Sequence, residues 1–283
     1  MKNNKLYIGL AGIAIAMTLP SCESDYLQLT PETSVSSGTM AEETIAAKMG
    51  IYGICNAMQT QYYETGYNQY SGEAFINTVF NDAFGPDYIC SLWQSSWGAS
   101  QYNWEAMENE RGTINSYPWN YCYNIIGLAN GVLDGVDNGN GSQAEKDFIK
   151  AQALTFRAHG YEKLLRWYAP RWKDSKNGEA YCVVLRLTSG TNDLPIVTMN
   201  QVLDQIYADL DEAIKLYTSS KGKRTYKWEP DIAVAQGVYA RTALIKNDWK
   251  KAQEMAHAAR ENYPVADLKT YFAGFVNDTN DNI

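Results

Sequence analysis

One long stretch of regular apolar spacing constrains the fold of this chain more than any other feature. It lies between Ser142, which can cap a helix, and Pro170, which must end one. Within it, apolar residues recur every three or four positions, at Ala144, Phe148, Ala151, Leu154, Ala158, Tyr161, Leu165 and Tyr168. This is the period of an α-helix, so the sequence predicts a long amphipathic helix here.

The same period predicts further helices on both sides of this one. They cover about residues 39–63, 115–134, 200–218, 231–246 and 248–262. The first is expected to begin at a capping box formed by Thr39 and Glu42. One face of that helix is expected to hold Ile45, Met49, Tyr52 and Gln59.

The last two predicted helices look like a hairpin of the tetratricopeptide type. Asn247 and Asp248 form a tight turn and an N-cap between them, Ala235 allows close packing, and Tyr239 and Trp249 are expected to fill the space. No repeat recurs at a strict period of about 34 residues, so the earlier helices are interpreted as divergent pairs. The sequence therefore predicts an all-α fold of stacked helix hairpins with a long aromatic-rich loop excursion.

The N-terminus has the layout of a secretory signal. A basic start precedes an apolar run of 14 residues, which is too short to span a bilayer. The run ends just before Cys22, which resembles the lipid-modified cysteine of a bacterial lipoprotein. The expected organisation is a signal peptide at 1–21, an extended lead-in at 22–38 and a helical domain at 39–283. A short strand is expected near 183–187.

The amino-acid composition argues against several classes of function. The formal net charge is −8, and removal of the signal leaves 22 basic and 32 acidic residues, which argues against a general nucleic-acid binder. Only His159 and His257 could supply imidazole, and the cysteines form no CxxC pair, so no metal or cofactor is expected. If Cys22 is lipidated, free thiols are expected for the others, although export would permit disulfides. These are Cys55, Cys90, Cys122 and Cys182.

Residues 62–123 concentrate the aromatic side chains. They hold 16 of the 36 aromatic residues, together with seven acidic residues and a single basic one. A groove that binds a phosphate backbone has the opposite charge balance, with basic residues in excess. Flat Trp and Tyr faces can stack on the C–H face of a sugar ring while amides and charged groups take its hydroxyls. The predicted glycan contacts are Trp93, Trp97, Tyr102 and Trp104 for stacking, with Asn103 and Arg111 for hydrogen bonds.

Core packing is the alternative for each of these tryptophans. Helical spacing assigns Trp119 and Tyr123 to the core, and Tyr161 and Trp167 are also interpreted as structural. His159 is interpreted as a surface or packing residue.

Four stretches together resemble one family, at residues 22–27, 119–130, 151–161 and 209–214. In this order they are similar to the SusD/RagB family of outer-membrane nutrient-binding lipoproteins. The acidic residues directly after Cys22 resemble the surface-export signal of Bacteroidetes lipoproteins. Gln152 stands where the family more often has Glu, which we expect to affect only a helix-packing contact.

The resemblance implies a surface lipoprotein that captures oligosaccharides, with a ligand-contact region in the interval of residues 62–123. It also implies a partner, a SusC-type TonB-dependent transporter in the outer membrane, over which the lipoprotein sits as a lid. Family members are typically much longer, so the resemblance covers only the N-terminal half of the family. The chain is accordingly expected to be a truncated sequence.

Two other functions stay open. The RagB side of the family implies capture of peptides, and a helical-repeat protein could also be an interaction module without a small ligand. Catalysis is not expected: Glu105 and Glu108 could pair as glycosidase carboxylates do, but such pairs are common on solvated helices. No GxSxG, P-loop or HExxH motif is present.

Overall fold

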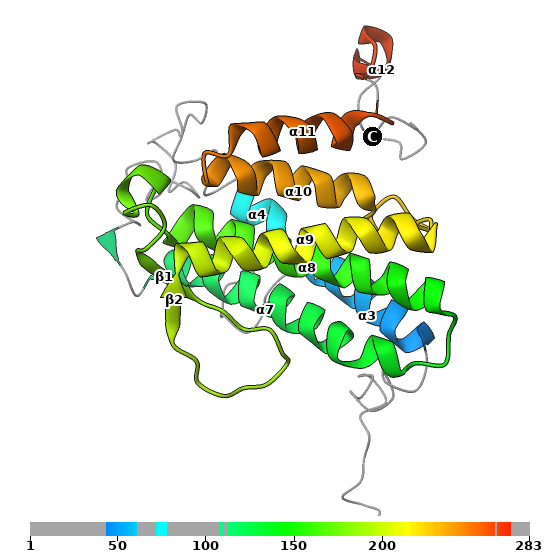
Figure 1. Cartoon of the computed structure of the whole chain (residues 1–283), viewed down its shortest axis with the longest axis horizontal. Coiled ribbons are helices and arrows are strands. Elements are labelled where there is room, and N and C mark those ends of the chain that lie inside the picture. The colour runs from blue at the N-terminus through cyan, green and yellow to red at the C-terminus, as the bar shows by residue number, and fades with distance from the viewer. Residues whose placement is uncertain (1–43, 61–71, 78–107, 110–111, 264, 273–283) are drawn as a thin grey trace, which may run out of the picture. The chain divides into compact units, whose positions relative to one another are not determined.

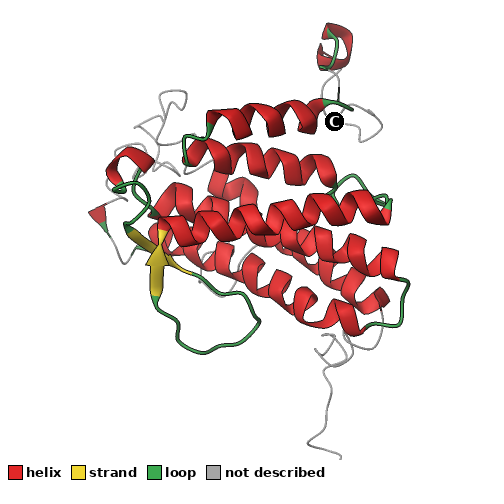
Figure 2. Cartoon of the chain, viewed as in Figure 1, coloured by secondary structure: helices red, strands yellow, loops and turns green. Residues whose placement is uncertain are grey.

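The computed structural model describes residues 44–60, 72–77, 108–109, 112–263 and 265–272. Within them the chain is built mainly of helices (Figures 1 and 2). The helices are α3 (Thr44–Ala57), α4 (Gly72–Asn77), α7 (Thr113–Gly135), α8 (Gln143–Tyr168), α9 (Met199–Ser220), α10 (Ile232–Ile245), α11 (Trp249–Arg260) and α12 (Leu268–Phe272). Two 3₁₀ turns, η4 (Val136–Asn138) and η5 (Trp172–Asp174), follow α7 and α8. The predicted all-α fold is confirmed.

Consecutive helices from α7 to α11 pack on one another, and α3 packs on α7 and α8. Side-chain caps fix where they begin. Ser142 and Thr198 each form a capping box, while the carboxylates of Asp231 and Asp248 accept backbone N–H groups of α10 and α11. This is the stacked-hairpin arrangement that the apolar period predicted, and the bounds of α7 to α11 lie within a few residues of the prediction. The helix expected over about 39–63 is described from Thr44 and ends at Ala57, and its predicted capping box of Thr39 and Glu42 lies outside the described residues.

The central helix α8 differs from its prediction. From Ala151 to Leu165 it is buried on nearly all sides, because α3, α7, α9, α10 and the strand β1 (Tyr181–Val184) all contact it. The expected apolar stripe is present, but polar residues between its members are buried too. They are Gln152, Thr155, Arg157, Glu162 and Lys163. The amphipathic spacing therefore predicted the position of the helix, but it did not predict that neighbouring elements also cover the polar face.

In two other helices the covered side differs from the apolar residues that the sequence singled out. In α3, Ile45 and Met49 are exposed, and the residues that pack inward are Ala46, Ala47, Ile51 and Ile54. In α11, Trp249 is 65% exposed, whereas Tyr239 on α10 is buried as expected. Among the described elements, α11 packs closely only against α10, so only the narrow stripe around Ala252 is covered.

Arg157 of α8 carries the most buried ion pair of the described residues. Its Nε and Nη2 donate to the Asp209 carboxylate of α9 at 2.7 and 2.6 Å. Its Nη1 donates to Oδ1 of Asn130 on α7 at 3.1 Å and to the carbonyl of Leu187 at 3.3 Å. One guanidinium therefore joins three helices and the loop after β1, with nearly every donor satisfied.

The strand β1 pairs antiparallel with β2 (Ile196–Thr198). Tyrosine hydroxyls fix the end of β1 and the loop that follows it. Tyr161 accepts the N–H of Arg186 and donates to its carbonyl, at 2.6 and 2.8 Å. Tyr123 does the same with Val184, at 2.9 and 2.7 Å. Burial raises the pKa of Tyr161 to about 12, so its hydroxyl keeps the proton that it donates. The structural interpretation of Tyr123 and Tyr161 is confirmed.

The described cysteines are unpaired. Cys122 is buried, and Cys55 and Cys182 are half-buried. Burial raises the pKa of the Cys55 thiol to about 12, which keeps it protonated and unreactive at neutral pH. The prediction of free thiols is confirmed for these three, and Cys90 lies outside the described residues.

Gly160 allows α7 and α8 to approach closely. A Cβ at this position would lie 2.7 Å from Cγ1 of Ile126. We expect Gly160→Ala to destabilise the fold by about 1–3 kcal/mol, because overpacking outweighs the roughly 1 kcal/mol gained in helix propensity. Gly237→Ala in α10 is the matched control: the added Cβ meets no described atom within 4 Å, so stability should rise by up to about 1 kcal/mol. Urea unfolding measures both, and equal shifts for the two variants would contradict this account.

Candidate functional site

The six predicted glycan contacts lie outside the described residues. They are Trp93, Trp97, Tyr102, Asn103, Trp104 and Arg111. Cys22, the predicted lipidation site, also lies outside them. These assignments stay predictions. The described residues nearest to them in the sequence include helix α4.

Helix α4 is the described helix between residues 61–71 and 78–107. Its first residue, Gly72, has a φ of +50°, and a Cβ there would lie 2.0 Å from the carbonyl oxygen of Met58. The hydroxyl of Tyr117 on α7 donates to the Gly72 carbonyl at 3.2 Å, and the ring of Phe75 packs edge-on against Tyr117. Only glycine fits this close, left-handed start.

A buried carboxylate fastens α4 to the helices beneath it. Glu73 lies 2.9 Å from Nε2 of His159 and 2.9 Å from Nζ of Lys163, both on α8. The Tyr121 hydroxyl donates to it at 3.0 Å, and Arg241 of α10 contacts the other ring nitrogen of His159 at 3.2 Å. His159 is thus a partly buried packing residue held by hydrogen bonds.

The two bases keep Glu73 ionised. Burial by itself raises the pKa of this carboxyl, but attraction to His159 and to Lys163, with their hydrogen bonds, holds the pKa well below its usual range. Lys163 is only 4% exposed, so Glu73 is the carboxylate that compensates for the burial of its ammonium group. The network fixes α4 in place. Among the residues described, no group of three or more His, Cys, Asp or Glu side chains is arranged to hold a metal ion.

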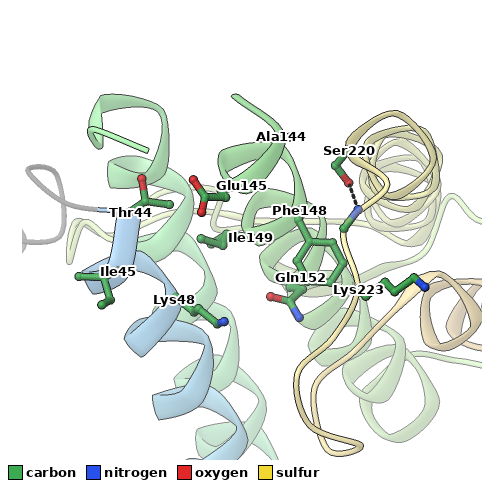
Figure 3. A pocket seen from close by; sticks show the side chains of 11 residues that line it. Thr44, Ile45, Lys48, Ala144, Glu145, Phe148, Ile149, Gln152, Ser220 and Lys223 are labelled. Carbon is green, nitrogen blue, oxygen red and sulfur yellow. Dashed lines mark hydrogen bonds between the residues drawn. The ribbon is translucent and has the colours of Figure 1, made fainter. Parts of the chain in front are cut away.

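A hollow of about 530 Å³ opens between α3, the start of α8 and residues 220–223 (Figure 3). Its apolar wall includes Phe148 and Ile149, and Lys48, Lys223 and Glu145 stand at its rim. The remaining lining residues are Thr44, Ile45, Ala144, Gln152, Ser220 and Gly222. The volume falls within the range of small-ligand sites, about 300–1,000 Å³.

Gln152 gives this hollow an unused hydrogen-bond acceptor. The side chain is fully buried, and its Nε2 donates to Oε2 of Glu229 at 3.2 Å and to the carbonyl of Pro230 at 3.1 Å. Its Oε1 has no hydrogen-bond partner, and Figure 3 shows the amide among the side chains that face the hollow. Buried polar atoms are rarely left unsatisfied in folded proteins.

A cluster of exposed aromatic rings lies next to the hollow. Tyr226 and Trp228, in the connection from α9 to α10, stack with centroids 4.9 Å apart and planes 7° apart, and each is half exposed. Tyr52 of α3 packs edge-on against Trp228. Backbone N–H groups of Thr225 and Tyr226 donate to the Glu229 carboxylate, which fixes the turn that presents the rings.

A second hollow, of about 320 Å³, adjoins these rings. It is lined by Tyr52, Cys55, Asn56, Gln59 and Trp228. Sequence reasoning missed this surface because it concentrated on residues 62–123. The signal that could have found it is Tyr226-Lys-Trp228, two aromatics at alternate positions in a short polar connection between helices.

Stacked helix hairpins with hollows and exposed aromatic rings place the chain in the class of helical-repeat folds. Residues 25–244 match a protein family described as SusD-like, starch-binding and associating with the outer membrane, and the chain belongs to this family. A comparison with curated proteins gives no match. None of the described helices is long and apolar enough to cross a membrane.

Solved structures share the fold. A SusD-like carbohydrate-binding protein from Bacteroides vulgatus is 26% identical, with a TM-score of 0.73 over 83% of this chain and 48% of its own. A SusD superfamily protein from Bacteroides thetaiotaomicron is 18% identical, with a TM-score of 0.64 over 81% of this chain and 49% of its own. Surface glycan-binding protein A from Bacteroides uniformis is 18% identical, with a TM-score of 0.57 over 77% and 45%. The chain therefore spans about half the length of these relatives.

Proposed function

We propose that this protein is a cell-surface lipoprotein that binds oligosaccharides and passes them to a SusC-type TonB-dependent transporter. A lipid on Cys22 would anchor it to the outer membrane. The observation that carries the proposal is the family match over residues 25–244, together with a carbohydrate-binding relative that is 26% identical. The protein acts by capture and handover, with no covalent chemistry.

The proposed ligand contacts are the six residues predicted between Trp93 and Arg111. Aromatic faces bury the apolar side of each sugar, and Asn103 and Arg111 select its hydroxyls by directional hydrogen bonds. Because the ligand must be released to the transporter, moderate affinity is expected. A glycan array on the purified protein tests the ligand class, and enrichment of peptides without any glycan signal would favour the peptide alternative instead.

Replacing Trp97 by alanine should weaken oligosaccharide binding about tenfold or more without unfolding the protein, because a stacking aromatic carries a large share of such an interface. Isothermal titration calorimetry against the best glycan on the array measures the change, and circular dichroism checks the fold. Trp249→Ala is the control, since Trp249 is 65% exposed on α11 and lines neither hollow. Unchanged affinity in a folded Trp97→Ala protein would show that this assignment is wrong.

A further inference from the structure

We propose that the two hollows along α3 together form a second saccharide site, lined by residues other than those predicted between Trp93 and Arg111. The ligand class, an oligosaccharide segment, rests on the proposed function. The site itself is inferred from the described residues of α3, α8 and the connection from α9 to α10.

The aromatic end of this site has the groups that bind a sugar ring. Trp228 and Tyr52 form a wall of the smaller hollow, and Trp228 is about half exposed. The side chains of Asn56 and Gln59 line the same hollow, and their amides make no hydrogen bond with any described residue. A pyranose can therefore place its C–H face on the rings and direct its hydroxyls to amides that are both donors and acceptors.

The other end offers an acceptor that the protein itself leaves unused. A sugar hydroxyl donating to Oε1 of Gln152 would satisfy this fully buried atom. The rim carries two cations, Lys48 and Lys223, and the Glu145 carboxylate. A charged ligand would meet a like charge on this rim, whereas a hydroxyl accepts from the ammonium groups and donates to the carboxylate.

Lys48 joins the two hollows. It lines the larger one, its Nζ lies 3.2 Å from Oγ1 of Thr225, and the same atom lies 5.7 Å from the ring centroid of Tyr52. From Thr44 in the larger hollow to Asn56 in the smaller one, α3 rises about 18 Å at 1.5 Å per residue. This distance exceeds one pyranose ring, so the site fits several linked sugars.

The test uses the full-length protein carrying Trp97→Ala, so that binding at residues 93–111 is already weakened. The probes are maltohexaose, laminarihexaose and the best glycan on the array, measured by calorimetry. Adding Trp228→Ala should lower the remaining affinity by about tenfold or more. Adding Trp249→Ala, another exposed tryptophan, should leave it unchanged.

A second variant blocks the larger hollow without removing any core side chain. Ala144 is exposed and lines it, so Ala144→Trp should also abolish the remaining binding. Gln143→Trp, one residue away and not lining the hollow, is the matched control.

Retained binding in the folded Trp97→Ala/Trp228→Ala protein, or in the folded Trp97→Ala/Ala144→Trp protein, would overturn the second site. So would complete loss of binding in Trp97→Ala alone, and in that case the proposed function stands. If the unmodified protein binds no glycan at all, both proposals fail.

Discussion

Replacing Arg157 by leucine should destabilise the protein by about 3–5 kcal/mol. The variant leaves the Asp209 carboxylate, which is 3% exposed, buried without its bidentate partner. It also removes the N–H groups that donate to Oδ1 of Asn130 and to the carbonyl of Leu187. Urea unfolding, followed by circular dichroism, measures the loss.

Two further variants separate the ion pair from simple side-chain loss. The double variant Arg157→Leu/Asp209→Leu should recover much of the lost stability, because no charge is then left buried alone. Arg171→Ala breaks the exposed pair with Asp174 and should change stability by less than about 1 kcal/mol. A loss below 1 kcal/mol for Arg157→Leu would mean that the buried pair does not hold the three helices together.

Glu73→Gln should also cost about 3–5 kcal/mol at pH 7, because it leaves Lys163 buried without a counterion. The same change weakens the contacts to His159 and Tyr121, so α4 loses its fastening to α7 and α8. Asp137→Asn is the matched control: it makes the same acid-to-amide change in the exposed pair with Lys150, and little effect is expected.

The pH dependence of this variant tests the charge directly. The folded pKa of Glu73 is lower than its unfolded value, so the unfolded chain takes up a proton first as the pH falls. The stability that Glu73 contributes is complete above the unfolded pKa, about 4.3, and is lost as the pH drops toward the folded pKa. The difference between wild type and Glu73→Gln should therefore shrink by about 1.4 kcal/mol per pH unit below about pH 4. A difference that stays constant from pH 7 to pH 3 would contradict an ionised Glu73.

The surplus of tyrosine shows how far residue type alone can predict a role. In residues 62–123 it predicted a ligand surface, yet within that interval Tyr117 and Tyr121 are buried in the core, and Tyr123, which helical spacing assigns to the core, packs against it. Their hydroxyls bond Gly72, Glu73 and Val184. A tyrosine fits both roles because it combines an apolar ring with a polar tip, and only its neighbours decide between them.

The sequence by itself determined the order of the helices from α7 to α11 and placed their ends within a few residues, because apolar period and capping side chains are local properties. The N-caps of α8, α10 and α11 are Ser142, Asp231 and Asp248, at the positions where the sequence predicted these helices to begin. It also carried the resemblance that named the family.

Only the tertiary structure decided which faces are covered. Trp249 was expected inside and is exposed, Arg157 lies on the polar side of a predicted amphipathic helix and is buried, and Trp228 is presented beside Tyr52 from a segment 176 positions away. Burial is set by what packs against a residue from distant parts of the chain. No local pattern contains that information.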